Sequence, residues 1–261
     1  MADTPPTRRP AEGTKPRGRR TQHLRTHAEV VAELANRQKT VKGAPAYSRF
    51  VNRRLGRHLA AWAYQQGLTP NQVTALSALS SALGIGALFA FGPSWPLGVL
   101  VTALLVLGYA LDSADGQLSR LRGGGSPAGE WLDHMVDSGK ICLLHLAVLV
   151  SLSRTDLDHS WLAVPAGYLV VNVMWFSGLL LTESLRRAGR GAAPAVKRAP
   201  VLRSLIVLPT DFGLLCLVFL MLGAPPVFLA CYGLLAVANL LFLAASMVVW
   251  YRDLSRMGRP A

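Results

Sequence analysis

Acidic residues, cysteines and internal repeats are scarce in this chain of 261 residues. Only 14 Asp and Glu stand against 27 Lys and Arg, which leaves a net charge of +13. The three cysteines, Cys142, Cys216 and Cys231, all lie in apolar stretches, which predicts buried packing thiols and neither a disulfide nor a metal cluster. The first 60 residues or so are polar and basic, so no cleavable signal peptide is recognised. The lack of repeats disfavours an inverted-repeat transporter.

The positive charge is unevenly distributed along the chain. Residues 1–68 contain 14 of the 27 Lys and Arg, whereas long later windows contain none, and hydrophobic residues make up 51% of the whole. A soluble domain of this length normally alternates short apolar stretches with charged residues. The segregation therefore indicates a basic tail attached to a membrane domain.

Six windows are long and apolar enough to cross a bilayer, which takes about 20 residues. They lie at about 71–92, 95–118, 131–152, 160–183, 204–223 and 226–250. We therefore predict an all-α integral membrane protein with six transmembrane helices. Lys and Arg gather before the first window, in the 119–130 and 184–203 connections and at the C-terminus, while the other loops contain only Arg154. By the positive-inside rule, both termini and the 119–130 connection face the cytoplasm, and we expect a multi-pass protein of a bacterial cell membrane.

The regions outside the predicted spans differ in character. Residues 1–44 are expected to form a basic, largely disordered cytoplasmic tail, because Pro, Arg, Gly and Thr dominate its first part, although residues 28–39 match one short amphipathic helix. Residues 69–251 form the predicted six-helix domain, and residues 252–261 a cytoplasmic C-terminal tail.

Residues 45–68 predict an amphipathic juxtamembrane helix. Five apolar side chains recur there at helical spacing, namely Phe50, Leu55, Leu59, Trp62 and Ala63. Four arginines lie among them. A basic helix with aromatic residues beside a first span is typical of an interfacial helix on anionic lipid. The same charge also fits the positive-inside rule alone. Since no recognition module accompanies it, nucleic acid is not an expected partner.

The first span opens with "LTPNQVT". Thr69 is suited to the N-cap and Pro70 to the first helical position, but this local role leaves Asn71 and Gln72 without a structural reason.

An acidic stretch, "LDSADGQLSRLRGGGSPAGEWLDHMVDSGK" (111–140), lies between apolar windows. Asp112 and Asp115 share one face of a helix, and Asp133 and Asp137 share one face of the next. The short connection predicts antiparallel neighbours whose carboxylates converge. Because clustered carboxylates repel one another, we expect two divalent cations there, and oxygen-only ligands favour Mg²⁺ or Mn²⁺. Two such ions suit in-line displacement at phosphorus.

Other residues of the stretch fit phosphate chemistry. Gly116 permits close approach of a ligand to the helix backbone, and Arg120 is placed at a helix end where its guanidinium can clamp a phosphate. The spacing of the aspartates excludes an EF-hand loop.

These residues resemble the signature D-x2-D-G-x2-A-R-x8-G-x3-D-x3-D of the CDP-alcohol phosphotransferases. Seven of the eight fixed positions and all the spacings agree, from Asp112 to Asp137, and Ser119 stands where the family usually has Ala. The resemblance covers about residues 45–250 and implies a two-metal, cytoplasm-facing enzyme in which an acceptor hydroxyl attacks the β-phosphorus of a CDP-linked donor and CMP leaves.

The resemblance also implies residue roles. Asp112, Asp115, Asp133 and Asp137 would be metal ligands, and Asp137 would also take the proton from the acceptor hydroxyl. The implied donor contacts are Asn71, Thr74, Gly116, Ser119, Arg120, Ser126 and Gly129. Possible acceptor contacts are Lys140, Arg186 and Arg198, although Lys140 fits an internal ion pair equally well.

We expect CDP-diacylglycerol as donor and a small polar alcohol or sugar-alcohol phosphate as acceptor. Dimers are common in the resembled family, so a homodimer is one candidate assembly, and the sequence does not fix the oligomeric state. One alternative uses a soluble CDP-polyol donor with an inositol phosphate-like acceptor, and another transfers phosphocholine or phosphoethanolamine to diacylglycerol. An ion-coupled transporter, with the carboxylates as a relay, is the alternative from another class.

Several further polar residues lie in or beside the spans. His145 and Asn172 are expected to form interhelical hydrogen bonds, and Asp211 either a polar break or an ion pair. Glu130 fits a helix-start carboxylate and His134 a polar lining residue.

Overall fold

The computed structural model describes residues 26–36, 45–189 and 201–257, and within these ranges it contains helices and no strand. Five helices are long and apolar enough to cross a membrane. They are α3 (Pro70–Ala90), α4 (Trp95–Leu121), α5 (Pro127–Leu152), α6 (Ala163–Gly189, preceded by a 3-10 turn over His159–Leu162) and α9 (Pro225–Met257). Large side chains such as Leu83 and Leu234 are more than half exposed on these helices, as expected of a surface that faces lipid.

The remaining predicted span, 204–223, is not one continuous helix, and the expected count of six transmembrane helices is not confirmed. The chain forms α7 (Val201–Ile206), a 3-10 turn (Leu208–Thr210), α8 (Phe212–Val218) and a further 3-10 turn (Phe219–Met221). Pro209 has no amide hydrogen to donate, and Asp211 starts α8 by accepting a hydrogen bond from the Gly213 amide at 3.0 Å. Asp211 therefore interrupts the apolar stretch, which is one of the two roles expected for it.

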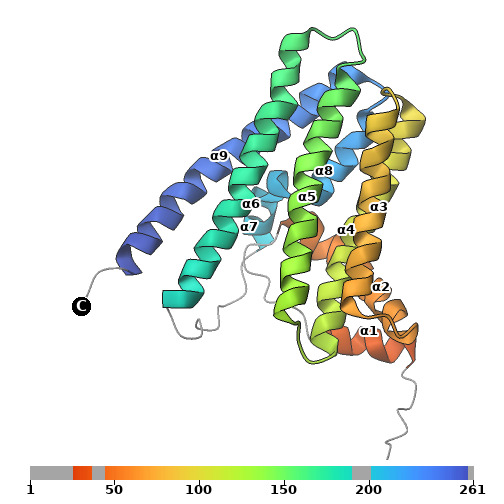
Figure 1. Cartoon of the computed structure of the whole chain (residues 1–261), viewed down its shortest axis with the longest axis vertical. Coiled ribbons are helices and arrows are strands. Elements are labelled where there is room, and N and C mark those ends of the chain that lie inside the picture. Colours follow the sequence, from red (N-terminus) through yellow and green to blue (C-terminus); the bar gives the residue numbers. More distant parts are fainter. Residues whose placement is uncertain (1–25, 37–44, 190–200, 258–261) are drawn as a thin grey trace, which may run out of the picture.

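The long helices form one bundle, with α9 crossing it obliquely (Figure 1). Helix α3 packs along both α4 and α5, α5 packs on α6, and α6 on α9, whereas α4 and α5 make few close backbone contacts with each other. The two helices that carry the acidic motif are thus joined by a short connection but diverge from it, which differs from the expected side-by-side pair.

Two apolar clusters hold the bundle together. The larger one joins α3, α4, α5, α6, α8 and α9 around aromatic side chains such as Phe219, Phe228 and Tyr232. Beside it, Asn172 Nδ2 lies 2.7 Å from His145 Nε2, and His145 also hydrogen-bonds to Tyr232, so the expected interhelical hydrogen bonds are confirmed. The smaller cluster lies at the end of the bundle where α3 begins and α4 ends, and joins these helices to the N-terminal segment.

The N-terminal segment contains two helices, α1 (His27–Asn36) and α2 (Arg53–Gln65), with a π-helical turn over Ser48–Asn52 before α2. Both lie at the lower end of the bundle in Figure 1. Helix α2 buries its alanines and exposes apolar side chains such as Leu55 and Trp62. It lies tightly on α4, since a Cβ added to Gly56 would come within 2.7 Å of Ser113 Oγ.

Candidate active site

The beginning of α3 is shaped by a capping box. The Thr69 hydroxyl accepts from the Gln72 amide at 3.3 Å, and the Gln72 side chain accepts from the Thr69 amide at 2.8 Å, with Pro70 at the first helical position. The expected N-cap is confirmed, and Gln72 has a structural role as the second residue of the capping box. Asn71, in contrast, lies against the start of α5. Its Oδ1 would be 3.1 Å from a Cβ added to Gly129.

Thr74, one turn into α3, fixes the first carboxylate. Its hydroxyl donates to Asp115 Oδ2 at 2.6 Å, and both side chains are buried. Further along, Ser77 donates to the Gly108 carbonyl at 2.8 Å and Ser80 to the Leu104 carbonyl at 2.8 Å. These bonds to α4 set the register of the two helices, so Thr74 and Asp115 meet as a consequence of the whole interface.

The two acidic helices, α4 and α5, are linked by Lys140. Its Nζ lies 3.0 Å from Asp112 Oδ1 on α4 and 2.7 Å from Asp137 Oδ1 on its own helix α5. One ammonium therefore draws two carboxylates together across the space where α4 and α5 diverge. Of the two roles expected for Lys140, the structure shows the internal ion pair.

The connection between α4 and α5 is tight because it is glycine-rich. Gly123 and Gly124 have φ values of +102° and +125°, which side-chain-bearing residues rarely adopt. Ser126 then caps α5 by accepting from the Gly129 amide at 3.0 Å, and Pro127 occupies the first helical turn. The turn thus starts α5 so that Asp133 lies beside the same space as Asp115.

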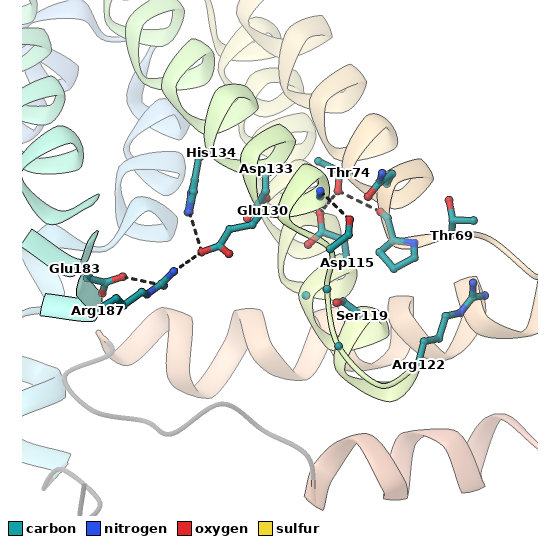
Figure 2. A pocket seen from close by; sticks show the side chains of 17 residues that line it. Thr69, Thr74, Asp115, Ser119, Arg122, Glu130, Asp133, His134, Glu183 and Arg187 are labelled. Atoms are coloured by element: carbon teal, nitrogen blue, oxygen red, sulfur yellow. Dashed lines mark hydrogen bonds and ion pairs between the residues drawn. The ribbon is translucent and has the colours of Figure 1, made fainter. Parts of the chain in front are cut away.

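These elements enclose a cavity of about 550 Å³. Figure 2 shows it between the start of α3, the end of α4, the start of α5 and the end of α6. Seventeen residues line it: Thr69, Pro70, Asn71, Thr74, Asp115, Gly116, Ser119, Arg122, Gly124, Gly125, Ser126, Gly129, Glu130, Asp133, His134, Glu183 and Arg187.

Six of the seven expected donor contacts line this cavity. Arg120 is the exception, and its guanidinium folds back along α4 so that a Cβ added to Gly116 would lie 3.4 Å from Nη1. Since Gly116 itself lines the cavity, the Arg120 guanidinium lies next to the lining. The resemblance thus names residues that the structure gathers around one space.

The α5–α6 side of the cavity is made of charged residues. Arg187 Nη1 lies 2.8 Å from Glu130 Oε1, and Arg187 Nη2 lies 3.7 Å from Glu183 Oε2 (Figure 2). His134 Nε2 lies 3.9 Å from the same Glu130 carboxylate. Sequence reasoning did not single out Arg122 or Glu183. The i, i+4 spacing of Glu183 and Arg187 near the end of a span was the available signal.

The acceptor residues expected from the sequence are dispersed. Arg186 Nη2 lies 2.6 Å from Asp253 Oδ2 on α9, and Arg186 is not among the residues that line the cavity. Arg198 lies outside the described residues. Arg187, the neighbour of Arg186 in the sequence, lines the cavity instead.

The donor atoms present fit a hard divalent cation. Asp133, His134 and Asp137 each present one ligand atom, and these atoms lie within 4.8 Å of one another. Asp115 lies within electrostatic reach of both Asp112 and Asp133. A site so rich in carboxylate oxygen suits Mg²⁺ or Mn²⁺.

Comparison with known proteins agrees with this geometry. The model of the CDP-alcohol phosphatidyltransferase family matches residues 67–251. The fold is similar to that of phosphatidylinositol phosphate synthase from Mycobacterium tuberculosis in complex with manganese and citrate, with 24% sequence identity, a TM-score of 0.53 and coverage of 74% of this chain and 87% of that chain. The same enzyme with CDP-DAG bound gives 23% identity, a TM-score of 0.53 and coverage of 77% and 94%. No match was found among curated proteins.

Proposed function

The chain belongs to the CDP-alcohol phosphatidyltransferase family, and from this premise we propose that it transfers a phosphatidyl group from CDP-diacylglycerol to a small polar alcohol or sugar-alcohol phosphate. The main support for this proposal is one cavity, in which α3, α4 and α5 bring together six of the expected donor contacts and the carboxylates Asp115 and Asp133. The solved relative with CDP-DAG bound supports this choice of donor.

A lipid donor is favoured over a soluble CDP-polyol by an apolar groove on the neighbouring face. The groove measures about 480 Å³ and is lined by Leu59, Trp62, Leu76, Leu79, Ser80, Leu83, Leu104, Leu107 and Leu111. Leu111 lies one helical turn before Asp115 on the same face of α4. A donor whose diphosphate lies beside Asp115 therefore has an apolar surface nearby for its acyl chains.

In the proposed reaction, Asp112, Asp115, Asp133 and Asp137 hold two Mg²⁺ or Mn²⁺ ions. When bound, these ions neutralise the diphosphate and polarise the reacting phosphorus. Asn71 and Thr74 contact the nucleotide part of the donor from α3.

Asp137 accepts the proton of the acceptor hydroxyl as its oxygen attacks the β-phosphorus. The new P–O bond forms while the bond to the departing CMP breaks, and CMP keeps the electron pair. Lys140 holds the Asp137 carboxylate in place through the 2.7 Å contact. Most of the catalysis is then positioning and charge stabilisation.

For the acceptor we propose the charged side of the cavity, and Arg187 as the group that receives an anionic substituent. Arg187 is bound by Glu130 at 2.8 Å, and it is 67% exposed, so its guanidinium is accessible to a phosphate that competes with Glu130.

We also propose that this end of the bundle faces the cytoplasm of a bacterial cell, as the charge distribution predicts. Exposed apolar residues of α2 such as Leu55 and Trp62, together with its arginines, support a position on the anionic membrane surface.

The deciding experiment measures CMP release by the purified protein with Mg²⁺ or Mn²⁺. One set of reactions contains CDP-diacylglycerol and the other a soluble CDP-polyol, each with a panel of alcohols and alcohol phosphates. We expect CMP from the lipid donor with at least one acceptor, and none from Asp137→Asn. CMP release from the soluble donor alone would overturn the choice of donor, and none from any pair would overturn the proposed reaction.

A further inference from the structure

Helix α1 lies outside the region matched by the family model, yet it is firmly built into the fold. Val30 and Leu34 are 0% and 1% exposed. Thr26 and Glu29 form a reciprocal cap at its start, because the Thr26 amide donates to Glu29 at 2.8 Å and the Glu29 amide donates to Thr26 Oγ1 at 3.3 Å. A helix of ten residues is marginal in water by itself, so its order depends on this docking.

The docking surface lies on the same helices as the proposed active site. Val30 and Leu34 belong to the smaller apolar cluster, together with alanines of α2 and residues of α3 and α4. Four cluster residues each directly precede a residue of the site: Val73 before Thr74, Leu111 before Asp112, Ala114 before Asp115, and Leu118 before Ser119. Because consecutive residues of a helix point about 100° apart, the cluster contacts α3 and α4 on a side next to the one that faces the cavity.

A second contact fixes α1 against α2. The rings of His27 and His58 stack with centroids 5.6 Å apart and an interplanar angle of 18°, and His27 Nε2 lies 3.3 Å from His58 Nδ1. Helix α2 in turn lies on α4 through Gly56. Because α4 has few close contacts with α5 at its other side, its motif-bearing end is braced by α3, α2 and α1.

We propose that α1 is a positioning element of the active site, which holds the end of α4 that carries Asp112 and Asp115. This inference rests on the proposed function, since it concerns the same cation and donor site. Coupling of this kind is reciprocal. A docked α1 raises the affinity of the site for Mg²⁺ and for the CDP moiety, and these ligands stabilise the docking of α1.

The test uses the full-length protein in detergent and two readouts. Hydrogen exchange of residues 27–36 is measured with and without Mg²⁺ and CDP, and the dissociation constants of both ligands are measured by calorimetry. Leu34→Asp places a charge in the buried cluster, and Ala32→Asp places the same charge on the exposed face of the same helix. Leu34→Ala is the milder variant, to be used if Leu34→Asp fails to fold.

We expect the ligands to slow exchange in α1 of the wild-type protein. We expect Leu34→Asp, or Leu34→Ala in its place, to speed that exchange and to weaken Mg²⁺ and CDP binding by about fivefold or more, with Ala32→Asp close to wild type. Faster exchange in α1 with unchanged ligand affinity would show that α1 only covers the fold, and would overturn the inference. Failure of the proposed function is recognised separately, because the wild-type protein would then release no CMP.

Discussion

Two groups of polar residues lie along α5, and they are organised in opposite ways. In its first turns, Asp133 lines a space of about 550 Å³ together with Asp115 of α4, and one to two turns later Asp137 and Asp112 of α4 share the ammonium of Lys140. Further along, His145 bonds to Asn172 and Tyr232 beside a much smaller cavity of about 130 Å³. The first group is charged and open to a ligand, whereas the second consists of neutral groups that satisfy one another.

The difference shows how to separate function from packing in a membrane helix. Neutral polar groups that pair across helices stabilise the bundle and need no ligand. Four carboxylates with one ammonium between two of them leave negative charge that only a bound cation neutralises. Substitutions of the carboxylates in the first group should therefore affect catalysis, whereas substitutions of their counter-ion Lys140 or of residues in the second group should affect stability.

The largest effect is expected from Asp133→Asn. Replacing a proposed metal ligand by a neutral amide removes several kcal/mol of charge stabilisation, so the rate of CMP release should fall by at least about 1000-fold. Initial rates at saturating Mg²⁺ measure it. The thermal unfolding midpoint serves as the control and should stay near that of the wild-type protein. A variant with full activity would remove Asp133 from the metal site.

The next effect is on stability. Lys140→Met leaves Asp112 and Asp137 without their shared ammonium, which should lower the free energy of unfolding by about 3 kcal/mol in the absence of divalent cations. Because a bound cation supplies the missing charge, Mg²⁺ should raise the unfolding midpoint of Lys140→Met more than that of the wild type. Lys140→Arg keeps the charge and is the control. Equal Mg²⁺ effects on all three proteins would contradict the arrangement.

A smaller loss of stability is expected in the second group. Asn172→Leu leaves the His145 ring nitrogen without its partner at 2.7 Å, which should cost about 2 kcal/mol of unfolding free energy. The turnover number of the protein that remains folded should be unchanged. Val170→Leu, at an exposed position of the same helix, is the matched control. A loss of turnover without a loss of stability would assign this group a role in catalysis.

The smallest effect is expected at the charged side of the large cavity. Arg187→Gln should raise the KM of an anionic acceptor by about tenfold, worth about 1.4 kcal/mol of binding, with little change in turnover number. Arg186→Gln, which breaks only the contact with Asp253, should leave this KM unchanged. If instead Arg186→Gln raises the KM and Arg187→Gln does not, the acceptor side has been misplaced.

Much of the site was predictable because it depends on local rules. Thr69, Pro70, Ser126 and Pro127 start helices through caps that act within a few residues. The three- and four-residue spacings put each pair of aspartates on one face of a helix, whatever surrounds it. The resemblance to the family added seven expected donor contacts, and six of these residues line the cavity.

Other features depend on how helices are placed against one another. The sequence could not tell Arg186 from Arg187, because neighbours on a helix point about 100° apart and either can face the bundle. Nor could the sequence choose between an acceptor contact and an internal ion pair for Lys140, since the ion pair with Asp112 depends on the distance between α4 and α5. In the 204–223 window the sequence left Asp211 with two roles, and only the fold showed that it starts a new helix there.

The amino-acid sequence by itself determined that this is a helical membrane protein with a paired acidic motif and basic ends, because bilayer thickness, helical periodicity and capping act on short stretches. Only the tertiary structure decided that α4 and α5 separate to leave a cavity, that Lys140 bridges them, and that α1 packs against the motif-bearing end of α4. These outcomes arise from contacts between residues far apart in the chain, which local patterns do not encode.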